Sequence, residues 1–266
     1  MFKKIKQKII NTINSKIYGR IYNKVYNQID CDFHILPKSQ ITYSNDLLYT
    51  FHNSDFIKNQ KFSKIYDEVK EIGGQLLMNY DIQWRIHVIT YFANVVKNLE
   101  GDFVDCGVNT GFCPMAVIKY TDFDKLGKKY YFFDTFQGMD PRFSSSYEME
   151  RHNKLGYGSQ VNVFENVQKR FSEYNVEIIK GAIPETLNSF KGNKVAYLSI
   201  DMNCVIPEVE ALNFFWDKMV KGGVIILDDY GYPGCSSQKL AHDDFAKSKG
   251  VEVLSLPTCQ GIIIKP

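Results

Sequence analysis

The last two apolar segments of the chain lie too close together for a parallel connection. Residues 251–256 (VEVLSL) and 261–266 (GIIIKP) both have the composition of strands, and only PTCQ separates them. Neighbouring parallel strands need a crossover of a dozen or more residues, so these two can pair only as an antiparallel hairpin. The sheet that contains them must therefore end in a hairpin.

Five further strand segments precede this hairpin and alternate with helical stretches. They are FVDCGV (103–108), KYYFFD (129–134), VEIIKG (176–181), VAYLSID (195–201) and GVIILDD (223–229). The near-continuous hydrophobicity of the middle segments predicts strands that are covered on both faces, as in a parallel sheet between helices. The sequence thus predicts an α/β fold. Its core is a Rossmann-like, doubly wound sheet of seven strands, mostly parallel, with a C-terminal antiparallel hairpin.

The chain ahead of these strands is predicted to add N-terminal helices. Residues 1–80 are expected to form a helical arm and cap, and residues 81–266 the main domain. A helix near residues 60–72 should end at Gly73-Gly74, and a second helix over 81–99 should lead into the first strand.

The first 29 residues are strongly basic. They contain six Lys, one Arg and no acid, which gives this arm a net charge of +7 and leaves the remainder at −5. Apolar residues recur every three or four positions, which predicts an amphipathic helix. It would rest weakly on an anionic membrane surface, or instead pack against the body or a second subunit of a homo-oligomer. Nucleic acid is a poor fit as a partner, because the basic residues are confined to this arm.

Cysteine usage and hydropathy point to the cytoplasm. The six cysteines show no C-x-x-C pair, which is typical of free thiols in a reducing compartment. No apolar run approaches the roughly 20 residues of a membrane span, and no signal-peptide core follows the first lysines. We therefore expect a cytoplasmic protein, at most peripheral to the inner membrane.

A glycine-rich turn follows the first predicted strand and precedes a helix. It reads DCGVNTGF, with Gly107 and Gly111 on either side of three residues. Such a turn permits close approach of a ligand, and the helix N-terminus favours negative charge. Asn109 replaces the middle glycine of a dinucleotide motif, and Asp105 would repel a pyrophosphate. A ligand with an amine for Asp105 and a carboxylate for the turn amides fits better; a plain packing turn is the alternative.

The second predicted strand also ends in an acid, Asp134. An acid at this place can accept hydrogen bonds from a ribose diol, although it could also serve only as a turn residue. Together with the amine and carboxylate sites, Asp134 predicts an adenosine that carries an amino-acid tail. That description fits S-adenosylmethionine.

Three acids end the fourth and fifth predicted strands. Asp201 closes the fourth, and Asp228 and Asp229 stand side by side after the fifth. Consecutive strands are usually neighbours, so these carboxylates should converge where open α/β sheets bind ligands. They would repel one another unless a cation lay between them, and all-oxygen ligands select Mg²⁺, Ca²⁺ or Mn²⁺. The pattern predicts a Mg²⁺ site; alternatively, Asp201 serves the cofactor while Asp228 and Asp229 cap a turn or a helix.

Six segments occur in a characteristic order: EGDFVDCGVNTG, FFDTFQGM, IIKGAIPETL, YLSIDMN, GGVIILDDYG and LPTCQGIIIKP. Together they resemble the macrocin O-methyltransferase family of class I S-adenosylmethionine-dependent methyltransferases, over residues 84–266. The resemblance implies a seven-stranded sheet whose last hairpin is antiparallel, in agreement with the spacing of the last two strands. It also implies that residues 81–266 form a class I methyltransferase domain.

The resemblance assigns roles to individual residues. It implies that the methyl donor is bound by Asp105, Gly107, Thr110 and Asp134, with Gly181 and Ala182 near the adenine. The adjoining positions complete the expected donor site: Asn109, Gly111, Thr135, Phe136 and Asp201. It implies that Mg²⁺ is held by Asp201, Asp228 and Asp229. Family members commonly methylate sugar hydroxyls on small acceptors.

Two departures from the family pattern stand out. Relatives that act on macrolide sugars often carry a second acid two residues after Asp201, where this chain has Asn203. The first-strand motif usually has Glu where this chain has Asp105, which gives a shorter reach to the amine. The acceptor pocket is therefore expected to differ, whereas the inferred metal ligands are all present.

Residues 138–160 form a long polar stretch after the second strand. We expect no regular structure there, and either a lid over the site or a solvated loop. Its basic residues would suit an acceptor that carries phosphate, such as a nucleotide-sugar: Arg142, Arg151, His152 and Lys154. By residue type, His152 and His242 are candidate general bases, and metal-bound Asp201 is a third.

These observations favour a Mg²⁺-dependent O-methyltransferase of a sugar hydroxyl. The acceptor would be a nucleotide-sugar or a surface-glycan precursor, for instance of capsule or lipopolysaccharide. The same fold would also serve a phosphoryl-type, phenolic or natural-product acceptor. A nicotinamide-dependent oxidoreductase is disfavoured by the missing G-x-G-x-x-G motif. The retained acids speak against a non-catalytic, membrane-associated scaffold.

Overall fold

The computed structural model describes residues 38–74, 81–155 and 161–266, with a few single positions before residue 38. Apart from those positions, the predictions for residues 1–29 lie outside the described residues. The chain divides into two compact units. One is Met1–Ser44 with Tyr49–Asn53, and the other is Asn45–Leu48 with Ser54–Pro266. The predicted domain boundary after residue 80 stays a prediction.

A small hairpin precedes the main sheet. Its strands β1 (Tyr43–Asn45) and β2 (Leu48–Thr50) form a two-stranded sheet. They are joined by Asp46 and Leu47, whose φ angles are 51° and 58°. Positive φ at both central residues is the conformation of the type I′ turn, which suits a two-residue connection.

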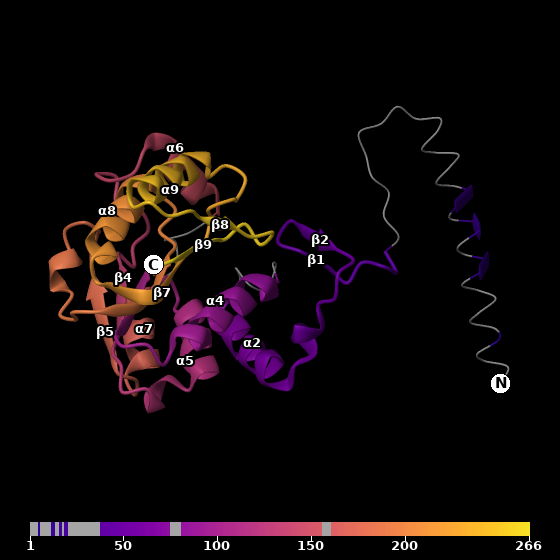
Figure 1. Ribbon diagram of the computed structural model, residues 1–266, viewed down its shortest axis with the longest axis horizontal. Coiled ribbons are helices and arrows are strands. Elements are labelled where there is room, and N and C mark those ends of the chain that lie inside the picture. The colour runs from indigo at the N-terminus through magenta and orange to yellow at the C-terminus, as the bar shows by residue number, and fades with distance from the viewer. Residues whose placement is uncertain are drawn as a thin grey trace. The chain divides into compact units, whose positions relative to one another are not determined.

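Seven strands form one sheet in the larger unit, in the spatial order β5-β4-β3-β6-β7-β9-β8 (Figure 1). Their bounds are β3 Asp102–Cys106, β4 Tyr130–Asp134, β5 Val176–Lys180, β6 Val195–Ile200, β7 Met219–Leu227, β8 Leu254–Ser255 and β9 Gly261–Ile264. The strands from β5 to β7 pair in parallel, whereas β9 pairs antiparallel with both β7 and β8. The predicted sheet and its C-terminal hairpin are confirmed.

Helices cover both faces of this sheet. They are α2 (Gln60–Gly73), α4 (Gln83–Val96), α5 (Phe112–Thr121), α6 (Ser146–Leu155), α7 (Val163–Phe171), α8 (Val205–Trp216) and α9 (Ser236–Ser248), with short 3-10 turns η1 (Asp55–Lys58), η2 (Phe123–Lys125) and η3 (Leu187–Ser189). The helices predicted near 60–72 and 81–99 are therefore confirmed as α2 and α4.

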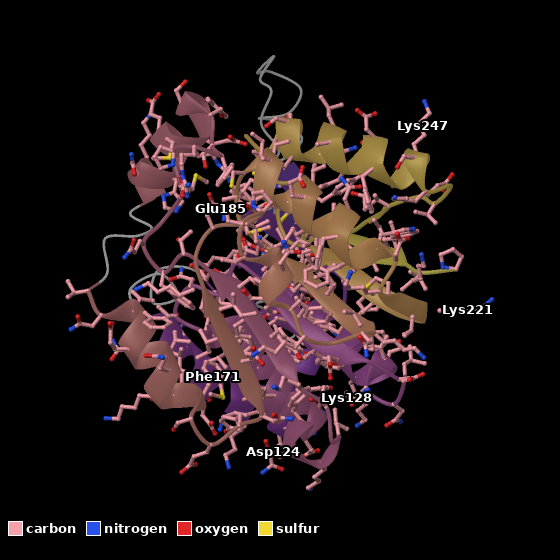
Figure 2. The ribbon with its side chains drawn as sticks, turned by 90° about the vertical axis from the view of Figure 1, so that its left-hand side faces the viewer. Asp124, Lys128, Phe171, Glu185, Lys221 and Lys247 are labelled. Carbon is pink, nitrogen blue, oxygen red and sulfur yellow. The ribbon has the colours of Figure 1, made fainter. Side chains whose placement is uncertain are left out.

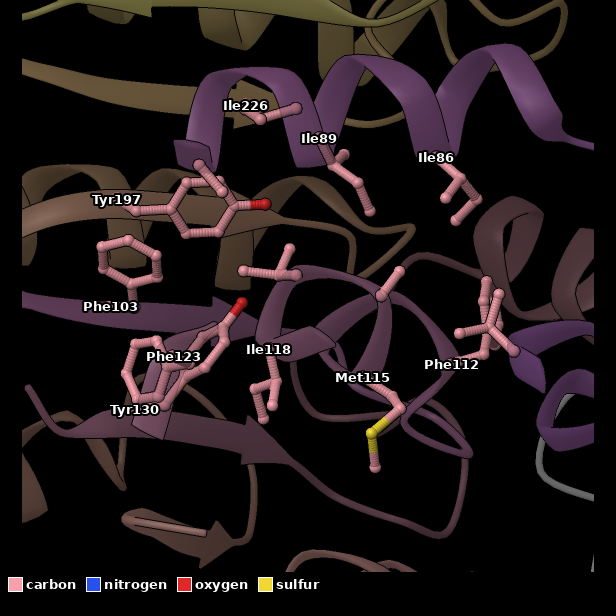
Figure 3. Packing of buried hydrophobic residues seen from close by; sticks show 14 of the residues in the cluster. Ile86, Ile89, Phe103, Phe112, Met115, Ile118, Phe123, Tyr130, Tyr197 and Ile226 are labelled. Carbon is pink, nitrogen blue, oxygen red and sulfur yellow. The ribbon is translucent and has the colours of Figure 1, made fainter. Parts of the chain in front are cut away.

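Successive strand residues point into two separate apolar cores. On β3, Phe103 joins the core under α4, α5 and α7, while Val104 joins the core under α8 and α9. In the first core, the Phe103 ring packs between Tyr130 of β4 and Tyr197 of β6 (Figure 3). Alternation of this kind is what a sheet covered on both faces requires.

Three of the charged side chains mark the periphery of this body. Asp124, Lys221 and Lys247 are exposed and lie at its outer edge (Figure 2). In the part of the chain that the structure describes, no helix has the length and apolar character that crossing a membrane demands.

The prediction that residues 138–160 lack regular structure is wrong, because helix α6 lies within them. A capping box begins this helix: Ser145 N donates to Glu148 Oε2 at 2.7 Å, and Glu148 N donates to Ser145 Oγ at 3.3 Å. Such reciprocal bonds satisfy free amides at a helix start. The second oxygen of Glu148 accepts from Val205 N at 2.9 Å, which ties α6 to the start of α8.

The functional edge of the sheet is set by strand register. Cys106 of β3 lies beside Ile200 of β6, and Ile200 lies beside Leu227 of β7. The residues that follow these three strands therefore meet at one edge: Gly107, Asp201 and Asp228.

Candidate active site

A hollow opens at the carboxyl ends of the parallel strands. It encloses about 1080 Å³ of empty space, open solvent at its mouth included. Eight of the predicted donor-site residues line it: Gly107, Asn109, Asp134, Thr135, Phe136, Gly181, Ala182 and Asp201. His152 of α6 lines it as well. The hollow lies where open α/β sheets bind small ligands.

The turn after β3 is held in left-handed conformations. Gly107 and Gly111 have φ angles of +93° and +87°, and Asn109 has a φ of 50°. Asparagine tolerates this region better than most residues, which explains how Asn109 stands where a dinucleotide motif has glycine. At Gly107 the need for glycine is absolute, because a Cβ there would lie 1.8 Å from the carbonyl oxygen of Asp201.

Asp134 organises the same turn. Its Oδ2 accepts hydrogen bonds from Val108 N at 2.7 Å and Asn109 N at 2.8 Å, and its Oδ1 accepts one from Phe136 N at 2.6 Å. An ionised carboxylate has about four acceptor positions, so Oδ1 keeps one for a ligand hydroxyl. This leaves room for the predicted contact with a ribose.

Asp105 and Thr110 lie outside the residues that line the hollow. Asp105 is 2% exposed, and Tyr130 Oη donates to its Oδ1 at 3.0 Å. Burial raises the pKa of Asp105 to about 8. Thr110 Oγ1 is also buried, without a hydrogen-bond partner among the described residues. Their predicted contacts with the donor stay predictions.

The three acids predicted as metal ligands gather at the edge of β6 and β7. Asp228 N donates to Ile200 O at 3.0 Å, which places Asp228 next to Asp201. The pKa of Asp201 is raised well above its ordinary value by burial and by the negative charges of Asp228 and Asp229. The pKa of Asp228 is raised too, chiefly by burial. In both cases burial is the largest cause, and the neighbouring Arg85 acts in the opposite direction.

The cation that contacts Asp228 and Asp229 is Arg85, for which the sequence predicted no role. Arg85, near the start of α4, is 8% exposed. Its Nη1 donates to Asp228 Oδ2 at 2.6 Å and to Asp229 Oδ1 at 3.1 Å. On its other side, Nε donates to Asp46 Oδ2 at 2.6 Å. The carboxylates raise the pKa of Arg85 well above its ordinary value even though burial lowers it.

The acids fit a hard dication in kind and in charge, although they are not assembled as a metal site. In the described part of the chain, no three His, Cys, Asp or Glu side chains form a group that could hold a metal ion. Every oxygen of Asp228 and Asp229 already faces a protein donor: Arg85, Gln260 at 2.9 Å or Arg151 at 3.5 Å. The all-oxygen donor set is nevertheless of the kind that Mg²⁺ takes.

Asn203 contributes an amide to the surroundings of Asp201. Its Nδ2 donates to Asp201 Oδ1 at 3.2 Å. An amide at this position therefore satisfies a carboxylate that a further acid would repel.

The structure separates the two candidate histidines. His152 lines the hollow, and burial lowers its pKa below the ordinary value. His242 is 2% exposed, with its Nε2 3.0 Å from Glu208 Oε2, and it does not line the hollow. We therefore do not retain His242 as a candidate base, because only its residue type indicated that role.

The basic residues of 138–160 pair with different acids. Arg142 pairs with Asp140 at 2.6 Å and with Glu185 at 2.7 Å, and Lys154 pairs with Glu150 at 2.7 Å. Arg151 lies 3.5 Å from Asp229 at the sheet edge. Their predicted contact with a phosphate of the acceptor stays a prediction.

A family model named macrocin-O-methyltransferase (TylF) matches residues 85–254, more than half of the chain. The chain belongs to the macrocin O-methyltransferase family. Within this TylF family, a mycinamicin III 3''-O-methyltransferase of Micromonospora griseorubida is 25% identical over 147 residues, 52% of this chain and 58% of the relative. A 4'-O-methyltransferase of Streptomyces olivaceus, named for a rhamnosyl-tetracenomycin C, is 23% identical over 164 residues, 57% of this chain and 62% of the relative.

The chain thus spans about three fifths of the length of the curated relatives it matches. Solved structures support the fold. The O-methyltransferase NovP superposes with a TM-score of 0.58 at 20% identity, over 68% of this chain and 79% of NovP. The calicheamicin methyltransferase CalS11 also superposes with a TM-score of 0.58, at 13% identity, over 80% of this chain and 94% of CalS11.

Proposed function

We propose that this protein transfers a methyl group from S-adenosylmethionine to a sugar hydroxyl of a small acceptor, either a nucleotide-sugar or a surface-glycan precursor. The observation that carries the proposal is membership of the TylF family over residues 85–254. The name of one relative supports the sugar acceptor, because that relative is named for a rhamnosyl compound. The hollow at the sheet edge supplies a place for the donor beside the acids.

Different residues of the chain would bind the donor and accept the proton of the acceptor hydroxyl. The donor supplies a methyl group on a positively charged sulfur, which leaves as S-adenosylhomocysteine. Asp134 and the backbone around Gly181 and Ala182 would hold the adenosine. The acceptor oxygen forms the new bond to the methyl carbon, and its proton passes to His152. A Mg²⁺ ion would be held by Asp201, Asp228 and Asp229 and would make a bound hydroxyl more acidic.

Donor binding tests the proposal without knowledge of the acceptor. Calorimetry should detect S-adenosylmethionine and S-adenosylhomocysteine at about micromolar to submillimolar concentration, and NADH should give no signal. Transfer of labelled methyl would then be assayed on a panel of nucleotide-sugars, lipid-linked glycans and phenols. The absence of any donor binding would refute a methyltransferase, whereas transfer only to phenols would refute the sugar acceptor.

Replacing His152 should slow methyl transfer and leave donor binding intact. A general base accelerates a reaction by a factor of about 10² to 10⁴, so the kcat of His152→Gln should decrease by a factor in that range. Because burial lowers the pKa of His152, the neutral base is present at pH 7, and wild-type kcat/KM should decline only below about pH 6.5.

A matched control is His87→Gln. Burial lowers the pKa of this histidine as well, but its ring stacks on Phe56 at 4.1 Å and does not line the hollow. Its variant should keep the wild-type rate and pH profile. An unchanged rate in His152→Gln would shift the role of base to Asp201.

A further inference from the structure

Arg85 divides its guanidinium between two sets of acids. Its Nε and Nη2 donate to Asp46 Oδ2 at 2.6 Å and Asp46 Oδ1 at 3.3 Å. Its Nη1 alone contacts the other set, Asp228 and Asp229. The bidentate contact to Asp46 is the stronger geometry for a guanidinium, so the loss of the Nη1 contacts would leave Arg85 anchored.

The Nη1 contacts occupy the oxygens that a dication would need. A metal ion held by Asp228 and Asp229 would lie against a buried, permanently charged guanidinium, and like charges repel strongly at such short range. Asp228 has little freedom to offer its other oxygen, since Oδ1 accepts from Gln260 Nε2 at 2.9 Å. Ion and guanidinium therefore compete for the same carboxylates.

We propose that Arg85 competes with the divalent cation for Asp228 and Asp229, and that Asp46 keeps the guanidinium when the cation is bound. The inference rests on the metal part of the proposed function. It assigns positioning roles to two residues outside the predicted site. Asp46 lies in the turn of the β1–β2 hairpin, 39 residues before Arg85. Metal occupancy would thus be linked to a segment that precedes the region matched by the family model.

The test is the affinity for Mn²⁺, followed by electron paramagnetic resonance of free Mn²⁺ without donor or acceptor. Arg85→Met should bind Mn²⁺ at least about tenfold more tightly than the wild type, because the competitor is gone. Asp46→Asn should bind it several-fold more weakly, because the displaced guanidinium has lost its other partner. In the Arg85→Met background, Asp46→Asn should have little further effect.

The double variant separates competition from simple charge effects. If Asp46 acted only by its own negative charge, its removal would weaken Mn²⁺ binding equally in both backgrounds, and the proposal would be wrong. Arg142→Met is the control for loss of a positive charge, since Arg142 pairs with Asp140 and Glu185 instead. It should leave Mn²⁺ affinity within about twofold of the wild type.

Three further results would overturn the proposal. Weaker Mn²⁺ binding in Arg85→Met would show that Arg85 supports the ligands instead of competing with the ion. Asp46→Asn keeps the shape of the side chain, so it stays informative even where Arg85→Met folds poorly. Tighter Mn²⁺ binding in Asp46→Asn would equally overturn the proposal. No Mn²⁺ binding in any variant would refute the metal site itself. Donor binding, measured on the same samples, reports separately on the methyltransferase proposal.

Discussion

Gly107→Ala should abolish donor binding and destabilise the fold by more than about 4 kcal/mol, a cost that few single substitutions reach. A Cβ at this position would lie 1.8 Å from the backbone oxygen of Asp201 and 2.5 Å from its carbonyl carbon. Neither strand end can retreat easily, since Gly107 N donates to Phe133 O and Asp201 N donates to Cys106 O, both at 2.8 Å. The added atom would force apart the ends of β3 and β6, where the donor is proposed to bind.

Two other glycines with positive φ provide matched controls. At Gly250, φ is +70° and an added Cβ meets nothing within 4 Å, so Gly250→Ala should cost only about 1–2 kcal/mol of backbone strain. At Gly111, the obstacle is the Phe171 ring at 2.6 Å, a side chain that can shift. Urea denaturation should therefore rank the losses as Gly107, then Gly111, then Gly250. Equal losses at Gly107 and Gly250 would show that the close approach of Asp201 is not the cause.

The sheet could be predicted because its signals are local. Strand composition, the spacing of the apolar segments and the four residues before Gly261 each constrain the backbone over a short range. The crossover argument alone required the antiparallel hairpin, and β8 and β9 pair accordingly. The acids of the edge could be predicted for the same reason, since each directly follows a strand.

The helix α6 was missed although its start was readable. Ser145 and Glu148 have the spacing of a capping box, S-x-x-E. The segment that follows is rich in charged residues and lacks a strong apolar stripe, so periodicity gave no signal. In this segment the capping pattern carried more information than hydrophobicity.

The role of Arg85 could not be read from local sequence. Its partners lie 39, 143 and 144 residues away along the chain, and no spacing rule connects them. The adjacent acids at 228–229 correctly indicated that positive charge was needed nearby. Which cation supplies it depends on the packing of α4 against the sheet, and that is a property of the tertiary structure.

The burial of Asp105 should make the donor-free protein less stable as pH rises. Its pKa is about 8 in the folded state, against an ordinary value of 3.8. Between these two values the folded state holds a proton that the unfolded state has already lost, so unfolding releases a proton and higher pH favours it. Below about pH 4 both states are protonated and the penalty vanishes; above about pH 8 it is constant. At roughly 1.4 kcal/mol per pH unit, the total is on the order of 5 kcal/mol.

Asp105→Asn should remove this contribution while keeping the shape of the side chain and an oxygen for the Tyr130 hydroxyl, which donates at 3.0 Å. Urea denaturation at several pH values gives the free energy of unfolding. From about pH 4 to 8, this free energy should increase in the variant relative to the wild type by roughly 1.4 kcal/mol per pH unit. Asp124→Asn, at an exposed residue, is the control, and its free energy of unfolding should change with pH as that of the wild type does. If the free energy of unfolding of Asp105→Asn also followed the wild type with pH, Asp105 would be ionised in the folded protein, and a positive charge would have to lie beside it. The ammonium of a bound donor would have that effect, so a saturating donor should narrow the difference between wild type and Asp105→Asn.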